Sequence, residues 1–382
     1  MKYRSASTKI TDPYRAGAEL GEKLADLCPE TVLVFCTIHY LESIADLTAG
    51  FRDVLGEKIL ICGGTGDGIY ETSGVANHGV NALGINSEGQ AQWKAALVRG
   101  VKADSALATM EAFRLAQAKL DAPVTLAFAL ADGLKADGSQ MVVGLRGATK
   151  APCFGGLAAD DRHFNRSIIF VGDEASEDAV MVLAACGNVP FRINAASGWK
   201  PVGDIGRVTR TEGVVVHEID GRPAEQFLRE QTGKTMGGME LVVLPIAEYT
   251  SKDDSQFVLR SCSHIEQNGP VTLFGRVSEG SRVQVCHAAL EEILGGVEAA
   301  LAGVNDNGFN PAAAIIISCA GRKWLLPESG LEEVDRTVKK LGPIPLIGFP
   351  SYGEISPFRS KDGAYSSAMF HNVTFVICVL GQ

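Results

Sequence analysis

Two oppositely charged side chains near the C-terminal end of the chain are the strongest candidates for chemistry. Arg322 follows an apolar, strand-like run that ends at Cys319, and Glu354 follows a second such run, 344–349, in a turn that Gly353 permits. An arginine at the end of a strand can clamp a carboxylate with two hydrogen bonds. Parallel neighbouring strands would bring both residues to one sheet edge, where α/β proteins usually bind ligands. We therefore predict that Arg322 and Glu354 hold the carboxylate and the ammonium of a zwitterion; the alternative is a structural salt bridge between them.

Five further polar residues belong to the predicted ligand site. Asn372 opens the terminal strand, and its amide can both donate and accept, although a turn contact explains it as well. Tyr352 belongs to the C-terminal acidic turn. Arg260 is a lone charge in the strand-like run FVLRSCS, and the alternative is that it faces solvent. Asp67 and Asp160 stand in small-residue loops, where they would contact a cation or an amine, or simply stabilise the turn.

A cysteine completes the set of candidate site residues. Cys319 in ISCAGR and Cys36 in VFCT occupy matching strand ends. A thiol hydrolase would need such a cysteine beside a histidine such as His371 or His39, whereas a buried structural cysteine is the alternative. The chain contains neither Gly-x-Ser-x-Gly nor His-Glu-x-x-His, and no glycine-rich nucleotide signature. We predict a ligand site that includes Cys319, and a cysteine or carboxylate hydrolase acting on a small amide is the alternative.

The acidic loops recur along the chain. In the stretches 59–70, 151–161 and 343–358, a short apolar strand opens into a small-residue loop that carries an acid. Four β-α-β-β units are predicted, and they begin near Val32, Val124, Val214 and Ala313. We predict an α/β fold with α+β character, made of mixed, largely antiparallel sheets covered by helices and arranged in two similar halves. Hairpin returns exclude an all-parallel sheet.

The units suggest a division of the chain. We predict an N-terminal capping helix in residues 1–30, a first domain in residues 31–208 and a second in residues 209–382. The alanine-rich segment from Ala91 to Leu120 is predicted to be helical, and the segment from Phe257 to His287 is predicted to be a β-meander.

Composition excludes several classes of protein. The 382 residues are 46% hydrophobic and carry a net charge of −10, which disfavours nucleic-acid binding. The start of the chain lacks the apolar core of a signal peptide, and the longest apolar run is too short to cross a bilayer. Nine cysteines without a Cys-x-x-Cys pair indicate reduced thiols and neither zinc nor a redox dithiol. We therefore predict a cytoplasmic protein that needs no metal or cofactor and does not insert into membranes.

The sequence resembles the FIST-domain family, with both its N- and C-terminal modules. The N-terminal resemblance lies in LVFCT, ILICGGTGDGI and APCFGGLAADD, and the C-terminal one in IIISCAGR, IPLIGFPSYGEISP and HNVTFVICVL. In the first acidic loop, where family members often have glutamate, this chain has Asp67. The resemblance implies a sensory module that binds a small ligand, with amino acids or their derivatives proposed for the family.

Three functions compete at this stage. The first is a small-molecule sensor, for an amino acid or a carboxylate, that signals through a partner protein. The second is the hydrolase described above. The third is an assembly protein whose β-meander, Phe257 to His287, forms the interface of a homodimer.

Overall fold

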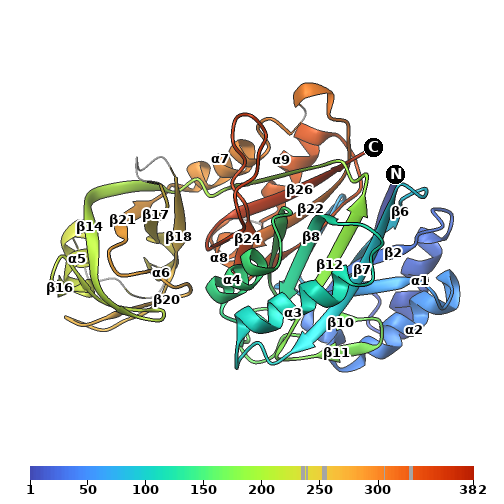
Figure 1. The fold of residues 1–382 in the computed structure, drawn as a ribbon, viewed down its shortest axis with the longest axis horizontal. Coiled ribbons are helices and arrows are strands. Elements are labelled where there is room, and N and C mark those ends of the chain that lie inside the picture. Colours follow the sequence, from blue (N-terminus) through green and yellow to red (C-terminus); the bar gives the residue numbers. More distant parts are fainter. Residues whose placement is uncertain (234–236, 238–239, 252–255, 305, 327–329) are drawn as a thin grey trace.

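The computed structural model describes residues 1–382 except 234–236, 238–239, 252–255, 305 and 327–329. The chain forms two parts that lie side by side (Figure 1). The larger part, which we call the body, contains residues 1–196 and the C-terminal segment from α7 (Leu290–Ala300) to residue 382. The smaller part, residues 200–287, is called the barrel. The body thus begins and ends the chain, and the barrel is inserted between its segments.

The body contains three six-stranded sheets with the same plan. The first has the strand order β1 (Lys2–Thr8), β6 (Val80–Asn86), β2 (Thr31–Cys36), β3 (Leu60–Thr65), β10 (Ile169–Val171), β11 (Glu174–Ser176). The second has the order β7 (Ala91–Arg99), β12 (Ala179–Gly187), β8 (Val124–Ala131), β9 (Cys153–Leu157), β24 (Glu354–Ser356), β25 (Met369–His371). The third has the order β13 (Phe191–Ala196), β26 (Phe375–Gly381), β22 (Pro311–Cys319), β23 (Leu346–Ser351), β4 (Ile69–Glu71), β5 (Gly74–Ala76).

Each sheet is built around one parallel pair and ends in a hairpin from another unit. The parallel pairs are β2–β3, β8–β9 and β22–β23, and all other pairings in the three sheets are antiparallel. The hairpin β4–β5 of the first unit extends the third sheet, β24–β25 of the third extends the second, and β10–β11 of the second extends the first. The three units therefore exchange hairpins in a cycle.

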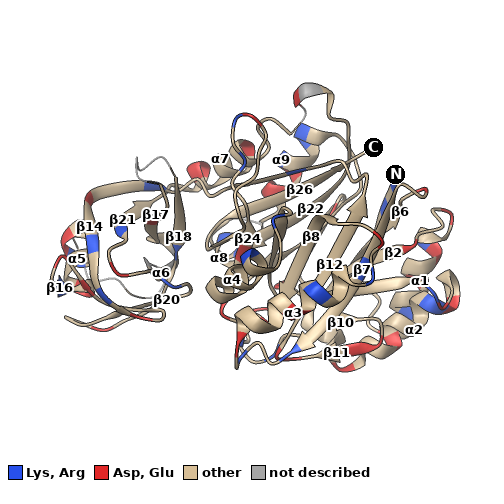
Figure 2. Ribbon diagram, viewed as in Figure 1, with Lys and Arg blue, Asp and Glu red and all other residues tan. Residues whose placement is uncertain are grey.

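Helices cover one face of each sheet, and the other faces pack together in the centre. The first sheet packs on α1 (Pro13–Ala25) and α2 (Ile44–Leu55), the second on α3 (Ser105–Gln117) and α4 (Gly138–Ala148), and the third on α7 and α9 (Leu331–Leu341). The central cluster joins all three sheets through Phe35, Phe128 and Phe349. Because the central strands are buried on both faces, they are almost continuously apolar, and charges lie mainly on helices and loops (Figure 2).

The remaining helical segments of the body are short. In the described residues they include a 3-10 turn at Ile38–Ser43, the helix α8 (Ala320–Leu325) that directly follows β22, and a 3-10 turn at Asp306–Gly308. Three of the longer helices begin at aspartates that accept a backbone N–H three residues on: Asp12 at α1, Asp104 at α3 and Asp137 at α4.

The barrel is a sheet that curls until its ends meet. Its strand order is β18 (Phe257–Arg260), β17 (Ile246–Tyr249), β21 (Arg282–His287), β14 (Lys200–Glu212), β15 (Val215–Ile219), β20 (Val271–Leu273), β19 (Cys262–Ile265), with β16 (Arg222–Pro223) beside β15. The helices α5 (Ala224–Thr232) and α6 (Glu240–Val243) belong to this part. The end strands β18 and β19 are separated in the chain only by Ser261, so the chain itself closes the sheet.

The predicted α/β class with mixed, largely antiparallel sheets covered by helices is confirmed. The arrangement in two halves of four units is corrected to three equivalent units. The segment that begins near Val214 has the same rhythm of strand, turn and helix, but β15 pairs antiparallel with β14 and β20 and has no parallel partner in the described residues. The order of strand, turn and helix in the sequence is the same whether the strand pairs in parallel or antiparallel, so it does not distinguish a fourth unit from the barrel.

Three local predictions also change. The start of the segment from Ala91 to Leu120 is the strand β7, because buried Ala91, Trp93 and Ala95 alternate with exposed residues. The strand β1 precedes the N-terminal helix. The strands expected between Phe257 and His287 exist, but closure of the barrel pairs β20 with β15 and β21 with β14 instead of with each other. Among the described residues no helix is long and apolar enough to span a membrane.

The hairpin exchange gives a testable prediction at Asn81. Its buried amide donates to the carbonyl oxygens of Tyr70 (2.6 Å) and Gly348 (2.9 Å) and accepts from the N–H of Phe35 (3.2 Å), which links the first unit to the third sheet. We expect Asn81→Ala to lower the free energy of unfolding in urea by about 2–4 kcal/mol, because buried backbone groups lose their partners. The exposed control Asn188→Ala should change it by less than about 0.5 kcal/mol. Equal effects of the two would contradict the role of Asn81.

Candidate functional site

The three acidic loops meet at one end of the parallel strand pairs. Asp67 follows β3, Asp160 follows β9, and Glu354 follows β23. Backbone hydrogen bonds join each loop to the next: the Asp67 N–H to the Pro350 oxygen (3.0 Å), the Ala159 N–H to the Thr65 oxygen (3.1 Å) and the Tyr352 N–H to the Leu157 oxygen (3.1 Å). The repeated loops seen in the sequence therefore form a closed ring of contacts.

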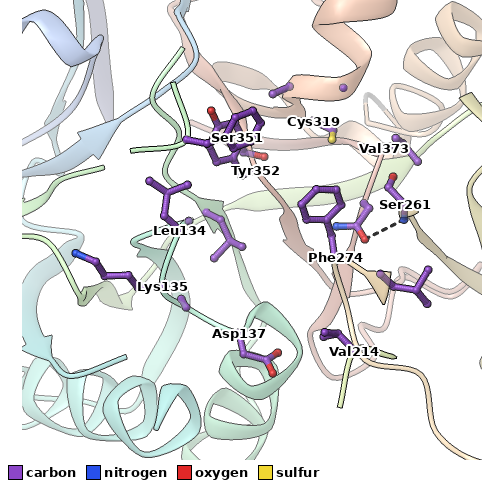
Figure 3. A pocket seen from close by; sticks show the side chains of 18 of the residues that line it. Leu134, Lys135, Asp137, Val214, Ser261, Phe274, Cys319, Ser351, Tyr352 and Val373 are labelled. Atoms are coloured by element: carbon purple, nitrogen blue, oxygen red, sulfur yellow. Dashed lines mark hydrogen bonds between the residues drawn. The ribbon is translucent and has the colours of Figure 1, made fainter. Parts of the chain in front are cut away.

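A cavity of about 380 Å³ lies beside this ring, where the body meets the barrel (Figure 3). The body contributes 133–137, 319–321, 351–352 and 372–373, together with Leu157, Phe164 and Trp324. The barrel contributes Val214, Ser261, Leu273 and Phe274. The volume and the mainly apolar lining with a few polar groups are typical of small-molecule sites.

Three aromatic side chains form one wall of the cavity. The ring of Phe164 stacks on that of Tyr352, with centroids 5.0 Å apart and an interplanar angle of 14°. Trp324 stands edge-on to both, at 6.1 Å and 6.4 Å. Two loop acids orient this wall: the Trp324 indole N–H donates to Asp67 (2.8 Å), and the Tyr352 hydroxyl donates to Asp160 (2.6 Å).

Asp160 also holds the loop that presents Phe164. Its carboxylate accepts the backbone N–H groups of Phe164 (2.9 Å), Asn165 (2.6 Å) and Arg166 (3.0 Å). Within this loop Phe164 has a φ of 49°, and Asp161 and Arg162 also have left-handed backbones. Such conformations persist only where surrounding contacts enforce them. The carboxylate supplies those contacts and leaves Phe164 54% exposed beside the cavity.

The polar groups in the cavity come from both parts of the molecule. The Ser261 hydroxyl is buried and has no hydrogen-bond partner among the described residues. The Ser261 N–H donates to the Asn372 side chain (3.2 Å, dashed in Figure 3), and the Asn372 N–H donates to the Leu259 oxygen (3.1 Å). Asn372 therefore links the body to the barrel by two hydrogen bonds at the edge of the cavity.

Glu354 lies behind the cavity wall. The hydroxyl of Ser351, which lines the cavity, donates to its Oε1 (2.6 Å), and the Thr374 N–H donates to its Oε2 (3.2 Å). Glu354 is fully buried and, in the described part of the chain, forms no ion pair within 4.0 Å. Burial raises the pKa of its carboxyl to about 8.

The predicted clamp of Arg322 and Glu354 is wrong. Arg322 does not line the cavity: its Nε donates to Glu333 (2.8 Å), and both side chains are fully buried. Further bonds reach the carbonyl oxygens of Ser197 and Ile293. Because α8 begins directly after β22, positions 320, 321 and 324 face the cavity, and the helical rotation turns position 322 toward α7 and α9. The alternative pair, Arg322 with Glu354, is not formed either.

Arg260 is a contact between the two parts and does not line the cavity. Its guanidinium donates to the Phe370 oxygen (2.7 Å) of the body and to Glu248 (2.9 Å) of the barrel, and it is buried, so the prediction that it faces solvent is also corrected. Asp67 accepts Lys323 (2.6 Å) beside its bond to Trp324. Of the predicted residues, Cys319, Tyr352 and Asn372 line the cavity, and Asp67 and Asp160 lie directly behind it.

Sequence reasoning missed Phe164, Trp324, Ser261 and Ser351. Two of these follow the recognised motifs closely: Trp324 comes two residues after IIISCAGR, and Phe164 comes three after APCFGGLAADD. An aromatic residue shortly after an acidic loop or a strand end was therefore the available signal. Ser261 had none, because its role depends on closure of the barrel.

Cys319 lies beside the Glu354 carboxyl and has no histidine partner in the described part of the chain. Burial raises the pKa of its thiol, and no hydrogen bond joins it to a histidine in the part of the chain that the structure describes. The His371 ring bonds to the Ser356 oxygen (3.1 Å), and burial lowers its pKa to about 4. No group of three metal-binding side chains is present among the described residues.

Comparisons with known proteins identify related sequences. The model of the FIST N domain matches residues 30–222, and that of the FIST C domain matches residues 217–357. An uncharacterised protein of Methanocaldococcus jannaschii is 36% identical over 75 residues, 20% of this chain and 15% of that protein. Uncharacterised proteins of Mycobacterium bovis and Mycobacterium tuberculosis are each 24% identical over 183 residues, 44% of this chain and 47% of theirs. This chain thus spans less than half the length of these relatives.

Among solved structures, a cyanuric acid hydrolase from A. caulinodans aligns with 100% of this chain and 99% of its own, with a TM-score of 0.40 and 7% identity.

The burial of Arg322 predicts a structural effect of its loss. Arg322→Met should lower the free energy of unfolding by about 3–5 kcal/mol, because Glu333 stays buried without its partner. The double variant Arg322→Met/Glu333→Met should recover most of this loss in urea denaturation. Surface ion pairs offer the control: Arg336→Met, which removes the bonds to Glu291 and Glu298, should cost less than about 1 kcal/mol. A double variant as unstable as the single one would contradict the pairing.

Burial of Glu354 predicts a pH dependence of stability. Its pKa is raised in the folded state, so the folded state binds more protons than the unfolded state between the ordinary carboxyl range and about pH 8. The stability of the wild type relative to Glu354→Gln should therefore fall as the pH rises from 5 to 8, by at most about 1.4 kcal/mol per pH unit. Urea denaturation at several pH values measures this difference, and a difference that stays constant would show that Glu354 has an ordinary pKa.

Proposed function

The chain belongs to the FIST family, with both its N and C domains, and on that premise we propose that it is a sensory protein that binds a small molecule in the cavity between body and barrel. FIST domains are sensory modules of signal transduction. The proposal includes a partner protein that receives the signal. It places the protein in the cytoplasm, in keeping with nine cysteines that form no disulfide.

One observation carries the proposal: the cavity has walls from both parts of the molecule. The rings of Tyr352 and Trp324 come from the body, and Ser261 and Phe274 come from the barrel. A ligand that touches both walls would favour one orientation of the barrel relative to the body. A differential contact of this kind is what a ligand needs to shift a conformational equilibrium.

The lining favours a small ligand with a ring and few polar groups. The aromatic wall supplies a flat, polarisable surface, and the unpaired Ser261 hydroxyl supplies a hydrogen bond. For the carboxylate that the sequence suggested, one cation stands at the aromatic wall: the Arg162 guanidinium lies 4.7 Å from the centroid of the Trp324 ring. Lys135 lines the cavity, but its amino group is bound to Glu177 (2.6 Å) and lies 3.6 Å from Asp132. The thiol hydrolase receives less support, because burial raises the pKa of the Cys319 thiol and no histidine bonds to it among the described residues.

Ligand binding is tested by thermal shift and tryptophan fluorescence with a panel of free amino acids, indole and small aromatic acids. A ligand that binds only the folded state raises the melting temperature, and at about 100 times its Kd it adds about 2.7 kcal/mol of stability. We expect the change in Trp324 fluorescence and the rise in melting temperature to occur with the same compound.

Matched variants separate cavity binding from surface binding. Trp324→Leu should remove the thermal shift, and Leu107→Ala, at an exposed position of α3, should leave it intact. If a compound raises the melting temperature of Trp324→Leu as much as that of the wild type, it does not bind in this cavity. If native mass spectrometry and the panel detect no bound molecule, the sensory proposal fails.

A further inference from the structure

A second cavity, of about 390 Å³, also lies between the body and the barrel. The body lines it with one side of α4 and with β25, and the barrel lines it with β17, β18 and the segment that follows β20. The helix α4 lies at the edge of the body that faces the barrel (Figure 1). Consecutive residues line different cavities, since Arg260 lines the second and Ser261 the first. The two cavities are therefore neighbours along the same joint.

Three guanidinium groups line the second cavity, but only one carboxylate does. Arg146 comes from α4, Arg260 from β18 and Arg276 from the segment after β20, and the acid is Glu248 of β17. Every other described residue that lines this cavity is uncharged. Because the whole chain carries a net charge of −10, this excess of cations is a local feature of the cavity.

Two of the three arginines have an acid of their own. Arg260 donates to Glu248 (2.9 Å), and Arg276 donates to Asp137 (2.5 Å), which does not line this cavity. Arg146 is different, because no carboxylate of the described residues lies within 4.0 Å of its guanidinium. One positive charge at the cavity is therefore uncompensated.

The guanidinium of Arg146 has donors to spare. Its Nε donates to the carbonyl oxygen of Ala368 (2.9 Å), and its two terminal nitrogens form no hydrogen bond to a described residue. It also lies close to a second cation: burial lowers the pKa of Arg260, and repulsion by Arg146 makes a smaller contribution in the same direction, against the effect of Glu248. An anion in the cavity would relieve this repulsion.

Hydroxyl groups and apolar side chains complete the lining. The hydroxyl oxygen of Ser139 accepts the N–H of Arg276 (2.9 Å), so its own hydrogen can be donated to a ligand, and Ser278 lines the barrel side. The exposed side chain of Val143 and that of Met369 supply apolar surface. Guanidinium forks and hydroxyls together offer more donors than the two oxygens of a carboxylate can accept, whereas a phosphoryl group has three acceptor oxygens and nearly two charges at neutral pH.

From this geometry we propose that the second cavity binds a small phosphate monoester, whose phosphoryl group pairs with Arg146 and faces the guanidinium groups of Arg260 and Arg276. Val143 and Met369 receive the organic part of the ester. Because the arginines come from both parts of the molecule, the bound ester bridges the body and the barrel. The inference goes beyond the proposed function: it adds a second ligand at a separate cavity and holds whether or not the first cavity binds a small molecule.

Isothermal titration calorimetry on the full chain compares phenyl phosphate, benzoate and inorganic phosphate at pH 7.5, where the ester carries about two negative charges. We expect phenyl phosphate to bind about tenfold or more tightly than benzoate, because it accepts at least one further hydrogen bond from a charged donor. Inorganic phosphate should compete with it. The bound ester should also raise the melting temperature of the chain.

Matched variants locate the bound ester. Arg146→Gln removes the uncompensated charge and should weaken the binding of phenyl phosphate by about tenfold to a hundredfold. Arg146→Lys keeps the charge without the fork and should recover part of this loss. Arg162→Gln is the control, because its guanidinium stands over the Trp324 ring of the first cavity, and it should leave the affinity unchanged. If Arg146→Gln does not fold, Arg276→Gln takes its place with the same expected loss.

The outcomes are distinct from those of the sensory proposal. If Arg162→Gln weakens binding and Arg146→Gln does not, the ester binds at the first cavity and the inference is overturned. Benzoate that binds as tightly as phenyl phosphate would overturn the choice of a phosphate ester, and no binding of phenyl phosphate or inorganic phosphate would overturn the site itself. The sensory function is tested separately by the ligand panel with Trp324→Leu, and none of these results decides it.

Discussion

Every sheet of the body is completed by a hairpin that another unit supplies, and the rest of the structure depends on this exchange. A free sheet edge exposes unpaired backbone groups and invites wrong pairing. Here β4–β5, β24–β25 and β10–β11 each extend a neighbouring unit's sheet, so no unit can complete its sheet alone. The buried amide of Asn81 reinforces one of these joints. Because the third unit follows the barrel in the chain, the body is complete only when residues on both sides of the barrel have come together.

The three-fold frame places three acids in similar positions, but each acid has a different role. Asp67 accepts Lys323 and orients the Trp324 indole, Asp160 holds a left-handed loop and the Tyr352 hydroxyl, and Glu354 accepts the Ser351 hydroxyl and one backbone N–H beside the Cys319 thiol. The difference lies in the surroundings of each acid. Two of them orient the aromatic wall of the cavity, and the third is a buried carboxyl whose pKa burial raises to about 8.

The barrel converts this end of the body into an enclosed site. Without it the aromatic wall and Cys319 would face solvent on the side where Ser261 and Phe274 now lie. Arg260 and Asn372 make the joint by hydrogen bonds to backbone atoms across the two parts. The sequence presents both as candidate ligand contacts, Arg260 as a lone charge among apolar residues and Asn372 because its amide can donate and accept. Such residues can equally well form hydrogen bonds between the body and the barrel, because a buried polar group needs a partner whatever its function.

The sequence by itself determined the class of the fold, the positions of most strands and helices, the three acidic loops and the family. These properties depend on local patterns: apolar runs, glycine turns and short motifs, which neighbouring residues already contain. Only the tertiary structure decided the number of equivalent units, the hairpin exchange and the partners of the charged residues. Arg322 and Glu354 follow two strands that pair in parallel, which is why the sequence suggested a shared site. The rotation of one short helix nevertheless turns Arg322 toward Glu333 and away from the cavity. Contacts between distant segments, such as Ser261 with Asn372, arise from sheet closure and packing, and no spacing along the chain encodes them.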